Sequence, residues 1–161
     1  MAESGNTTDG LATMRTGLAR HAATGTRLGR NDFLGLLADA LTHIGEFAEA
    51  LTVLAEAEGV SLGGEVHCAE TLRRRAELLA RTGAPDAEVE ATFAGSLEIA
   101  RRHGAKQHEL RTATRYARWL RDHGRGGEGR ALLTPLYAWF TEGFDTGDLI
   151  EAKALLDELT P

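Results

Sequence analysis

Three glycines divide much of this 161-residue sequence into segments of similar length. Gly45 and Gly83 are 38 residues apart, and Gly83 and Gly124 are 41 residues apart. Each glycine follows a stretch whose apolar residues recur with the period of an amphipathic helix, and glycine readily takes the left-handed conformation that ends a helix. A succession of helix, tight turn and helix between such glycines is typical of repeated helical hairpins. The spacing therefore predicts an all-α chain built from similar helix pairs.

The composition agrees with this interpretation, because Ala, Leu, Arg and Glu favour helices and the sequence has only three prolines. The small, polar residues 1–10 are expected to form a disordered lead-in, and residues 11–161 a single helical domain. The periodicity predicts eight helices, at about residues 10–24, 31–44, 46–58, 64–82, 86–103, 106–123, 126–141 and 147–159.

Small and large residues coincide when the segments are aligned on their glycines. Ala38, Ala76 and Ala117 each stand seven residues before the glycine, where two helices must approach closely. Leucines stand four residues before each glycine, at Leu41, Leu79 and Leu120. The coincidence indicates that the segments are structural repeats.

The segment DFLGLLADALTHIGEFAEALTVLAEA, from Asp32 to Ala57, resembles the tetratricopeptide repeat family in its apolar–small spacing, its turn glycine and its later Ala–large–Ala triplet. The resemblance implies a right-handed α-solenoid of about three antiparallel helix pairs, with an N-terminal half-unit helix and a C-terminal capping helix. The second unit differs by having Arg75 where a large apolar residue is usual, and the third has Gly129 where the family prefers Ala.

Nearly the whole chain from about Gly17 onward resembles the C-terminal helical-repeat tail of large bacterial regulators. The most specific part of this resemblance is YAWFTEGFDTGDL, from Tyr137 to Leu149. Those proteins combine an NTPase module with a nucleotide-cyclase or DNA-binding domain. The resemblance implies a regulatory role, either as an excised tail or as a stand-alone relative of one. The aromatic residues near this end are expected to seal the last helix pair beneath the closing helix 147–159.

In tetratricopeptide-like solenoids the first helix of each pair lines a concave groove, so the resemblance implies candidate groove residues here. Three of them recur at i, i+4 and i+7 and share one helix face. The candidates for binding a partner are Arg73, Glu77, Arg81, Arg111, Arg115, Arg118 and Arg121. Guanidinium groups suit an acidic segment or a C-terminal carboxylate of a partner protein.

Three alternatives remain open. The arginines could instead form a solvated face, paired with the neighbouring carboxylates Glu70, Glu77, Glu109 and Asp122. The array could also close around a small acidic metabolite as a sensor, or serve as an oligomerisation tail. In the last case exposed solenoid ends would form a homodimer.

Other functions are disfavoured by the sequence. The net charge of −6 argues against a nucleic-acid binder, and the absence of a long apolar run argues against a membrane span. Cys68 has no second cysteine to pair with, so a cytoplasmic protein is expected. The run Gly124 to Gly129 formally matches G-x-G-x-x-G, but no strand precedes it.

No recognisable catalytic or metal-ligating constellation stands out, and several histidines are explained by helix C-termini. We therefore expect a protein that is not an enzyme and has no cofactor or metal.

Overall fold

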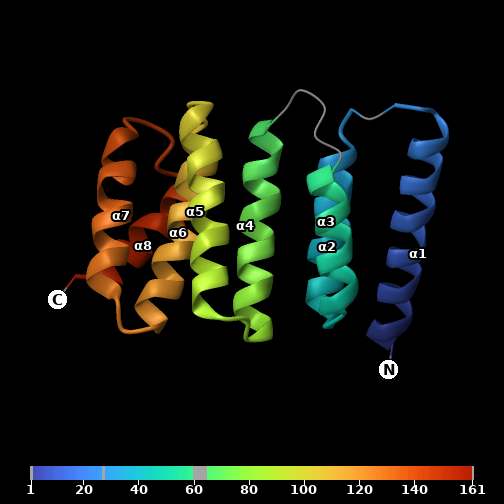
Figure 1. Ribbon diagram of the computed structural model, residues 1–161, viewed down its shortest axis with the longest axis horizontal. Helices are drawn as coiled ribbons and strands as arrows, with labels where there is room; N and C mark the ends of the chain where they lie inside the picture. Colours follow the sequence, from blue (N-terminus) through green and yellow to red (C-terminus); the bar gives the residue numbers. More distant parts are fainter. Residues whose placement is uncertain (1, 27, 60–64, 161) are drawn as a thin grey trace.

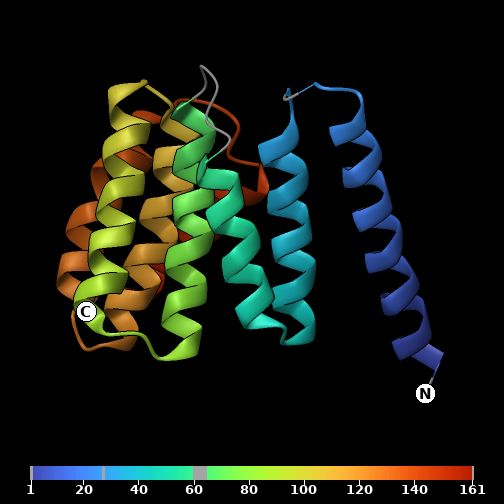
Figure 2. The same cartoon turned by 45° about the vertical axis from the view of Figure 1, so that its right-hand side comes forward.

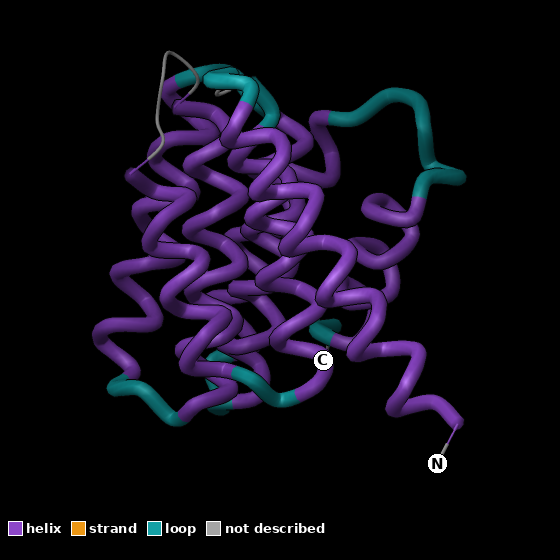
Figure 3. Tube along the Cα trace, turned by 90° about the vertical axis from the view of Figure 1, so that its right-hand side faces the viewer, coloured by secondary structure: helices purple, strands orange, loops and turns teal. Residues whose placement is uncertain are grey.

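The computed structural model describes residues 2–26, 28–59 and 65–160, and within them it contains eight helices and no strand. This confirms the all-α prediction (Figures 1 and 3). The helices are α1 (Ala2–Ala23), α2 (Arg30–Ile44), α3 (Phe47–Gly59), α4 (Glu65–Thr82), α5 (Asp86–Arg102), α6 (Lys106–Asp122), α7 (Gly126–Trp139) and α8 (Gly147–Glu158).

The N-terminus differs from the expectation of a disordered lead-in over residues 1–10. Helix α1 begins at Ala2, so the described residues 2–10 are part of the helix. Adding residues to an existing helix is far less costly than starting one, because each added residue fixes only its own backbone and gains a hydrogen bond. The small, polar residues can therefore continue a helix that the apolar residues after Gly10 begin to anchor.

The three repeat glycines end helices as expected. Their φ angles are 89° at Gly45, 73° at Gly83 and 75° at Gly124, all in the left-handed region. A fourth glycine, Gly129, has a packing role, because a Cβ atom there would lie 2.9 Å from the carbonyl oxygen of Ala117. The loss of the side chain lets α7 approach α6 closely, which explains why the third unit has glycine at this position.

The even-numbered helices form a continuous row. Helix α2 packs against α4, α4 against α6 and α6 against α8. In contrast, the backbones of α1, α3, α5 and α7 come close only to helices adjacent in the sequence, among the described residues. Figure 2 shows the resulting succession of helices, with α1 at one end. The row of even-numbered helices is therefore the place where segments remote in sequence meet.

Alanines make the close helix contacts that the repeat alignment predicts. Ala38 is 1% exposed, and Ala76 and Ala117 are fully buried. The largest side chains of the core are buried around them, at Leu41, Leu54, Leu78, Phe93, Leu110, Leu133 and Leu155. Burial of such side chains supplies the main stabilisation of an array whose helices are individually short.

The aromatic residues near the C-terminus are only partly covered. Tyr137 and Phe140 pack against the core that α6, α7 and α8 share, as expected. Trp139 and Phe144 remain 58% and 47% exposed, so the expectation that this whole group seals the last pair is wrong for these two.

Among the described residues, no helix combines the length and the apolar character needed to cross a membrane.

Candidate functional site

Ion pairs at equivalent repeat positions join successive even-numbered helices. Asp39 of α2 contacts Arg74 of α4, with Oδ2 3.1 Å from Nε. Glu77 of α4 contacts Arg115 of α6, with Oε1 3.6 Å from Nε. Both acids stand six residues before their turn glycine, and both arginines stand nine residues before theirs. The same type of contact is thus made twice, at the same distances from two turn glycines.

A second type of contact recurs near the opposite end of the same helices. Nδ1 of His67 lies 3.3 Å from Oδ1 of Asp32, and Nδ1 of His108 lies 3.7 Å from Oε2 of Glu70. The acids stand thirteen residues before their glycines and the histidines sixteen. Two contacts therefore tie α2 to α4 and α4 to α6 in the same register.

The charges are reversed where α6 meets α8. Here α6 supplies the cations and α8 the carboxylates: Nε of Arg111 lies 2.7 Å from Oδ2 of Asp148, and Nη2 of Arg118 lies 2.7 Å from Oε1 of Glu151. Arg115 also donates to Glu151, at 2.5 Å, so Arg115 bridges Glu151 and Glu77. The last helix is consequently attached by charge as well as by its apolar side chains.

A polar cleft of about 110 Å³ lies where α4, α6 and α8 meet. Its lining residues are Glu70, Arg73, Arg111, Thr114, Arg115, Asp148 and Glu151. The cleft is therefore lined by three arginines and three carboxylates. The Arg73 side chain is 11% exposed, whereas that of Arg111 is 37% exposed. Arg111 and Arg115 are consequently the cations that an incoming group would reach first.

The deepest charges of the cleft hold each other ionised. Burial alone would raise the pKa of the Glu70 carboxyl, but contacts with His108 and Arg73 outweigh it and hold that pKa well below its usual value. Burial likewise opposes the charge of Arg73, yet Glu70 and Glu77 raise the pKa of its guanidinium. Arg73 contacts both carboxylates, with its Nη2 atom 2.6 Å from Glu70. The floor of the cleft is thus the ion pair of Glu70 and Arg73.

The predicted groove residues do not all reach this cleft. Arg81 lies with its guanidinium carbon 5.5 Å from the ring centre of Phe47 and lines a smaller cleft between α2 and α4. Arg121 pairs with Asp122 at 2.9 Å and with Glu158, beyond the lining of the cleft. Arg73, Arg111 and Arg115 line the cleft directly, whereas Glu77 and Arg118 join it through the residues they contact.

The pairing of these arginines follows much of the solvated-face alternative. Glu70, Glu77 and Asp122 each contact a groove arginine, as that alternative requires. Glu109 does not: it is buried and lies 2.7 Å from both Arg101 and Lys106. These contacts show how the arginines are held in the free protein. They are compatible both with a partner-binding groove and with a solvated face.

Sequence reasoning missed several members of the site, namely Arg74, His108, Asp148 and Glu151. For Arg74 and His108 a signal existed, because each has a repeat equivalent at the same distance from its glycine. For Asp148 and Glu151 of α8 no signal existed in the sequence, because their pairing with arginines depends on how α8 packs on α6.

The glycine-rich run before α7 and the tryptophan of α6 have structural explanations. The G-x-G-x-x-G run follows α6 and opens α7, and no strand precedes it among the described residues. Trp119 is 8% exposed and stacks on His123, with ring centres 4.0 Å apart. Within the described part of the chain, no group of three or more His, Cys, Asp or Glu residues could hold a metal ion.

Comparison with known proteins gives no family assignment. The chain matches no protein-family model, and no curated protein matches it either.

Proposed function

We propose that this chain is a tetratricopeptide-like interaction module that binds an acidic segment or a C-terminal carboxylate of a partner protein. In this proposal α2–α3, α4–α5 and α6–α7 are the repeated pairs of an α-solenoid, α1 is a half-unit and α8 is the cap. The binding face is formed by the even-numbered helices around the polar cleft. The observation that carries the proposal is the recurrence of equivalent ion pairs along this face.

The recurrence supports a repeat array because unrelated helices have no reason to make the same contact in the same register. Asp39–Arg74 and Glu77–Arg115 follow the glycine spacing of 38 and 41 residues. The packing of the helices also supports a repeat array. Successive even-numbered helices pack against each other, whereas the backbones of α3, α5 and α7 do not come close to one another. In a curved solenoid the helices that lie closest together are those on the inner side, where extended binding surfaces form.

The choice of an acidic ligand follows from the arginines of α6. Arg111, Arg115 and Arg118 have side chains 34–37% exposed, so solvent reaches each of them. A guanidinium has five N–H donors, and Arg111 donates to Asp148 through Nε, a bond that does not use the donors of its terminal nitrogens. Arginines already fixed by carboxylates lose little side-chain entropy when a ligand binds. A ligand carboxylate can therefore share them.

The balanced charge of the cleft limits the expected affinity for an acidic ligand. Three arginines face three carboxylates, so no strong net positive field attracts an anion from a distance. Binding must come from short-range bidentate contacts, and affinity in the micromolar range, about −8 kcal/mol, is a reasonable expectation. Such contacts at partly exposed sites weaken with salt.

The test is a fluorescence anisotropy titration with a short labelled peptide rich in Asp and Glu that ends in a free carboxylate. Its amidated form and its Asn/Gln counterpart serve as ligand controls. Arg118→Glu is expected to weaken binding about tenfold or more. Arg102→Glu makes the same charge change on α5, outside the proposed face, and is expected to leave binding unchanged.

Salt provides an independent readout. Raising sodium chloride from about 0.1 M to about 1 M shortens the screening length from about 10 Å to about 3 Å and should weaken the complex. Equal binding of the acidic peptide and its Asn/Gln counterpart, or equal loss in both protein variants, would remove the arginine face from the proposal.

A small dicarboxylate is a second candidate ligand, because the cleft has room for an isolated polar group but not for a large molecule. In that case a dicarboxylate that binds only the folded state would raise the melting temperature, and the rise would grow with the logarithm of its concentration above the dissociation constant. Thermal shift by succinate in the wild type and not in Arg111→Gln, with no binding of the peptide, would favour the sensor.

A further inference from the structure

Large apolar side chains are exposed at the two ends of the molecule. Among the described residues, seven are exposed. Four lie in or beside α2, at Leu28, Phe33, Leu36 and Ile44, and three lie towards the C-terminus, at Trp139, Phe144 and Ile150. The described parts of α3, α4, α5 and α6 have none. Figure 1 places α1 and α2 at one end of the row of helices and α7 and α8 at the other.

The N-terminal end contains an apolar cleft. It lies between α1 and α2 and has a volume of about 420 Å³. Its lining residues are Met14, Gly17, Leu18, His21, Phe33 and Leu36. A space of this size and lining is typical of sites that receive apolar groups. Gly17 leaves the wall open, since a Cβ atom there would meet no other residue within 4 Å.

The repeat pattern shows what kind of element this cleft lacks. The backbones of α3 and α5 each lie between two even-numbered helices, whereas within the described chain the backbone of α1 comes close to that of α2 alone. Leu36 stands nine residues before Gly45, where Arg74 and Arg115 stand in the later repeats. Those arginines contact the preceding even-numbered helix, but Leu36 lines the cleft instead. The cleft is therefore the position of an even-numbered helix that would precede α1.

The C-terminal end has the opposite deficiency. Helix α8 packs on α6 and α7, as an even-numbered helix should, but no described helix follows it. Its outer face presents Ile150, which is 55% exposed, together with exposed residues Lys153, Ala154 and Asp157. One end of the molecule thus carries an odd-numbered helix without its even-numbered partner, and the other end carries an even-numbered helix without its odd-numbered partner.

We propose that this chain self-associates head to tail, with α8 of one copy packing beside α1 and α2 of the next. Ile150 enters the apolar cleft, and the two half-units complete one helix pair across the interface. Because the two surfaces differ, the contact is heterologous and generates chains or rings rather than only a closed dimer. The proposal uses the repeat arrangement of the proposed function but not its acidic ligand.

The experiment is sedimentation velocity over a concentration series from about 1 μM to about 1 mM, with one blocking substitution at each end. Leu36→Glu places a charge at the cleft, and Ile150→Glu places one on the outer face of α8. Both residues are at least half exposed in the isolated chain, so folding should survive, as circular dichroism verifies. Ala94→Glu adds the same charge at an exposed position of α5 and is the matched control.

The wild type and Ala94→Glu should increase in mass with concentration, and each end variant should associate at least about tenfold more weakly. A mixture of the two end variants should then form a one-to-one heterodimer, since each retains the surface that the other lacks. The groove variant Arg118→Glu should associate like the wild type, which separates this proposal from the peptide-binding one.

Gly17→Leu provides a second test that adds no charge. The leucine fits the open wall of the cleft and should exclude Ile150 of the next copy, while Gly10→Leu changes the same helix outside the cleft lining. Weakened association in Gly17→Leu alone supports the proposal. A wild type that stays monomeric throughout, an Ile150→Glu variant that still dimerises by itself, or a variant mixture without a heterodimer would each overturn it.

Discussion

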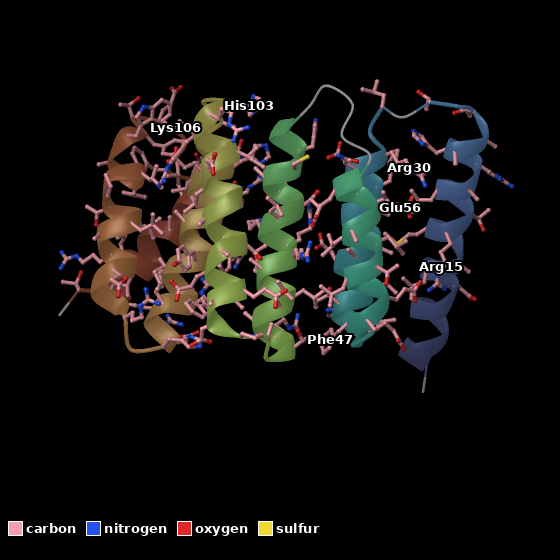
Figure 4. The ribbon with its side chains drawn as sticks, in the orientation of Figure 1. Arg15, Arg30, Phe47, Glu56, His103 and Lys106 are labelled. Atoms are coloured by element: carbon pink, nitrogen blue, oxygen red, sulfur yellow. The ribbon has the colours of Figure 1, made fainter. Side chains whose placement is uncertain are left out.

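The two ends of the molecule are attached in different ways. At the C-terminal end, the short helix α8 buries Leu149, Ala152 and Leu155 and pairs its acids with arginines of α6. At the N-terminal end, the longer helix α1 buries Leu11 alone among its described side chains. Its ion pair, from Arg15 (labelled in Figure 4) to Glu49 of α3 at 2.6 Å, is about half exposed on both sides. Helix length is thus a poor guide to how firmly a terminal helix is held.

The difference shows what closes a helical array. An end helix is firmly attached when it makes the kinds of contact found in the interior. Helix α8 does so with an apolar face and with an ion-pair face whose charges are reversed. Among the described residues, the backbone of α1 comes close to that of α2 alone, and an apolar cleft lies between the two helices. Elements with few buried contacts open at low free-energy cost without unfolding the rest.

The largest expected effect comes from deleting a core side chain of α8. Leu155→Ala removes a side chain that is 1% exposed and should lower the free energy of unfolding by about 3 kcal/mol. Leu18→Ala, on the half-buried face of α1, should cost less than about 1 kcal/mol. Urea denaturation measures both. Similar losses in the two variants would contradict the difference between the ends.

The next largest effect on the free energy of unfolding is expected at Glu70, in the cleft where α4, α6 and α8 meet, and this effect depends on pH. Because the pKa of Glu70 is lower in the folded chain than its usual value of 4.5, its charge stabilises the fold fully above pH 4.5 and progressively less as the pH falls. Glu70→Gln should cost about 2 kcal/mol at pH 7. The difference in the free energy of unfolding between wild type and variant should become smaller below pH 4.5. A difference that is constant with pH would show that the carboxylate charge is not the stabilising feature.

A smaller effect is expected where charge attaches α8. Glu151→Gln weakens the contacts with Arg115 and Arg118 and should reduce stability by about 1 kcal/mol. Glu98→Gln is the matched control: Glu98 pairs with Arg102 on one exposed helix face and should change stability by less than about 0.5 kcal/mol. Thermal and urea unfolding compare them. An equal response would mean that the ion pairs of α8 contribute no more than surface pairs do.

The smallest effect should come from the only ion pair that ties α1 to α3 among the described contacts. Arg15→Gln removes the contact with Glu49 and should change stability by less than about 0.5 kcal/mol, because both side chains are well exposed. A loss of more than about 1 kcal/mol in denaturant would show that α1 is held more firmly than its burial indicates.

The sequence predicted the helices well because their signals are local. Periodic apolar residues placed the eight segments, and glycines at 45, 83 and 124 ended them in the conformation expected. The repeat alignment also predicted the buried alanines, since close packing demands a small side chain at a fixed distance from the turn. Residues 2–10 were the exception, because composition describes intrinsic preference and not the continuation of a neighbouring helix.

The candidate site was only partly predictable because its contacts join distant segments. The arginine stripe of α6 was visible from helical spacing, but its pairing with Asp148 and Glu151 depends on how α8 packs. Arg81 and Arg121 share helix faces with the site residues and yet lie against other neighbours. Spacing along a helix fixes which residues share a face, and only the packing of helices fixes what that face meets.

Hydrogen exchange of the wild type, measured helix by helix with and without the acidic peptide at saturating concentration, locates the binding face. Binding by the face of the even-numbered helices should add protection in α4, α6 and α8, cause little change in α3 and α5, and leave α1 in fast exchange with or without peptide. Protection confined to α5 and α7, or to the cleft between α1 and α2, would contradict binding by the face of the even-numbered helices.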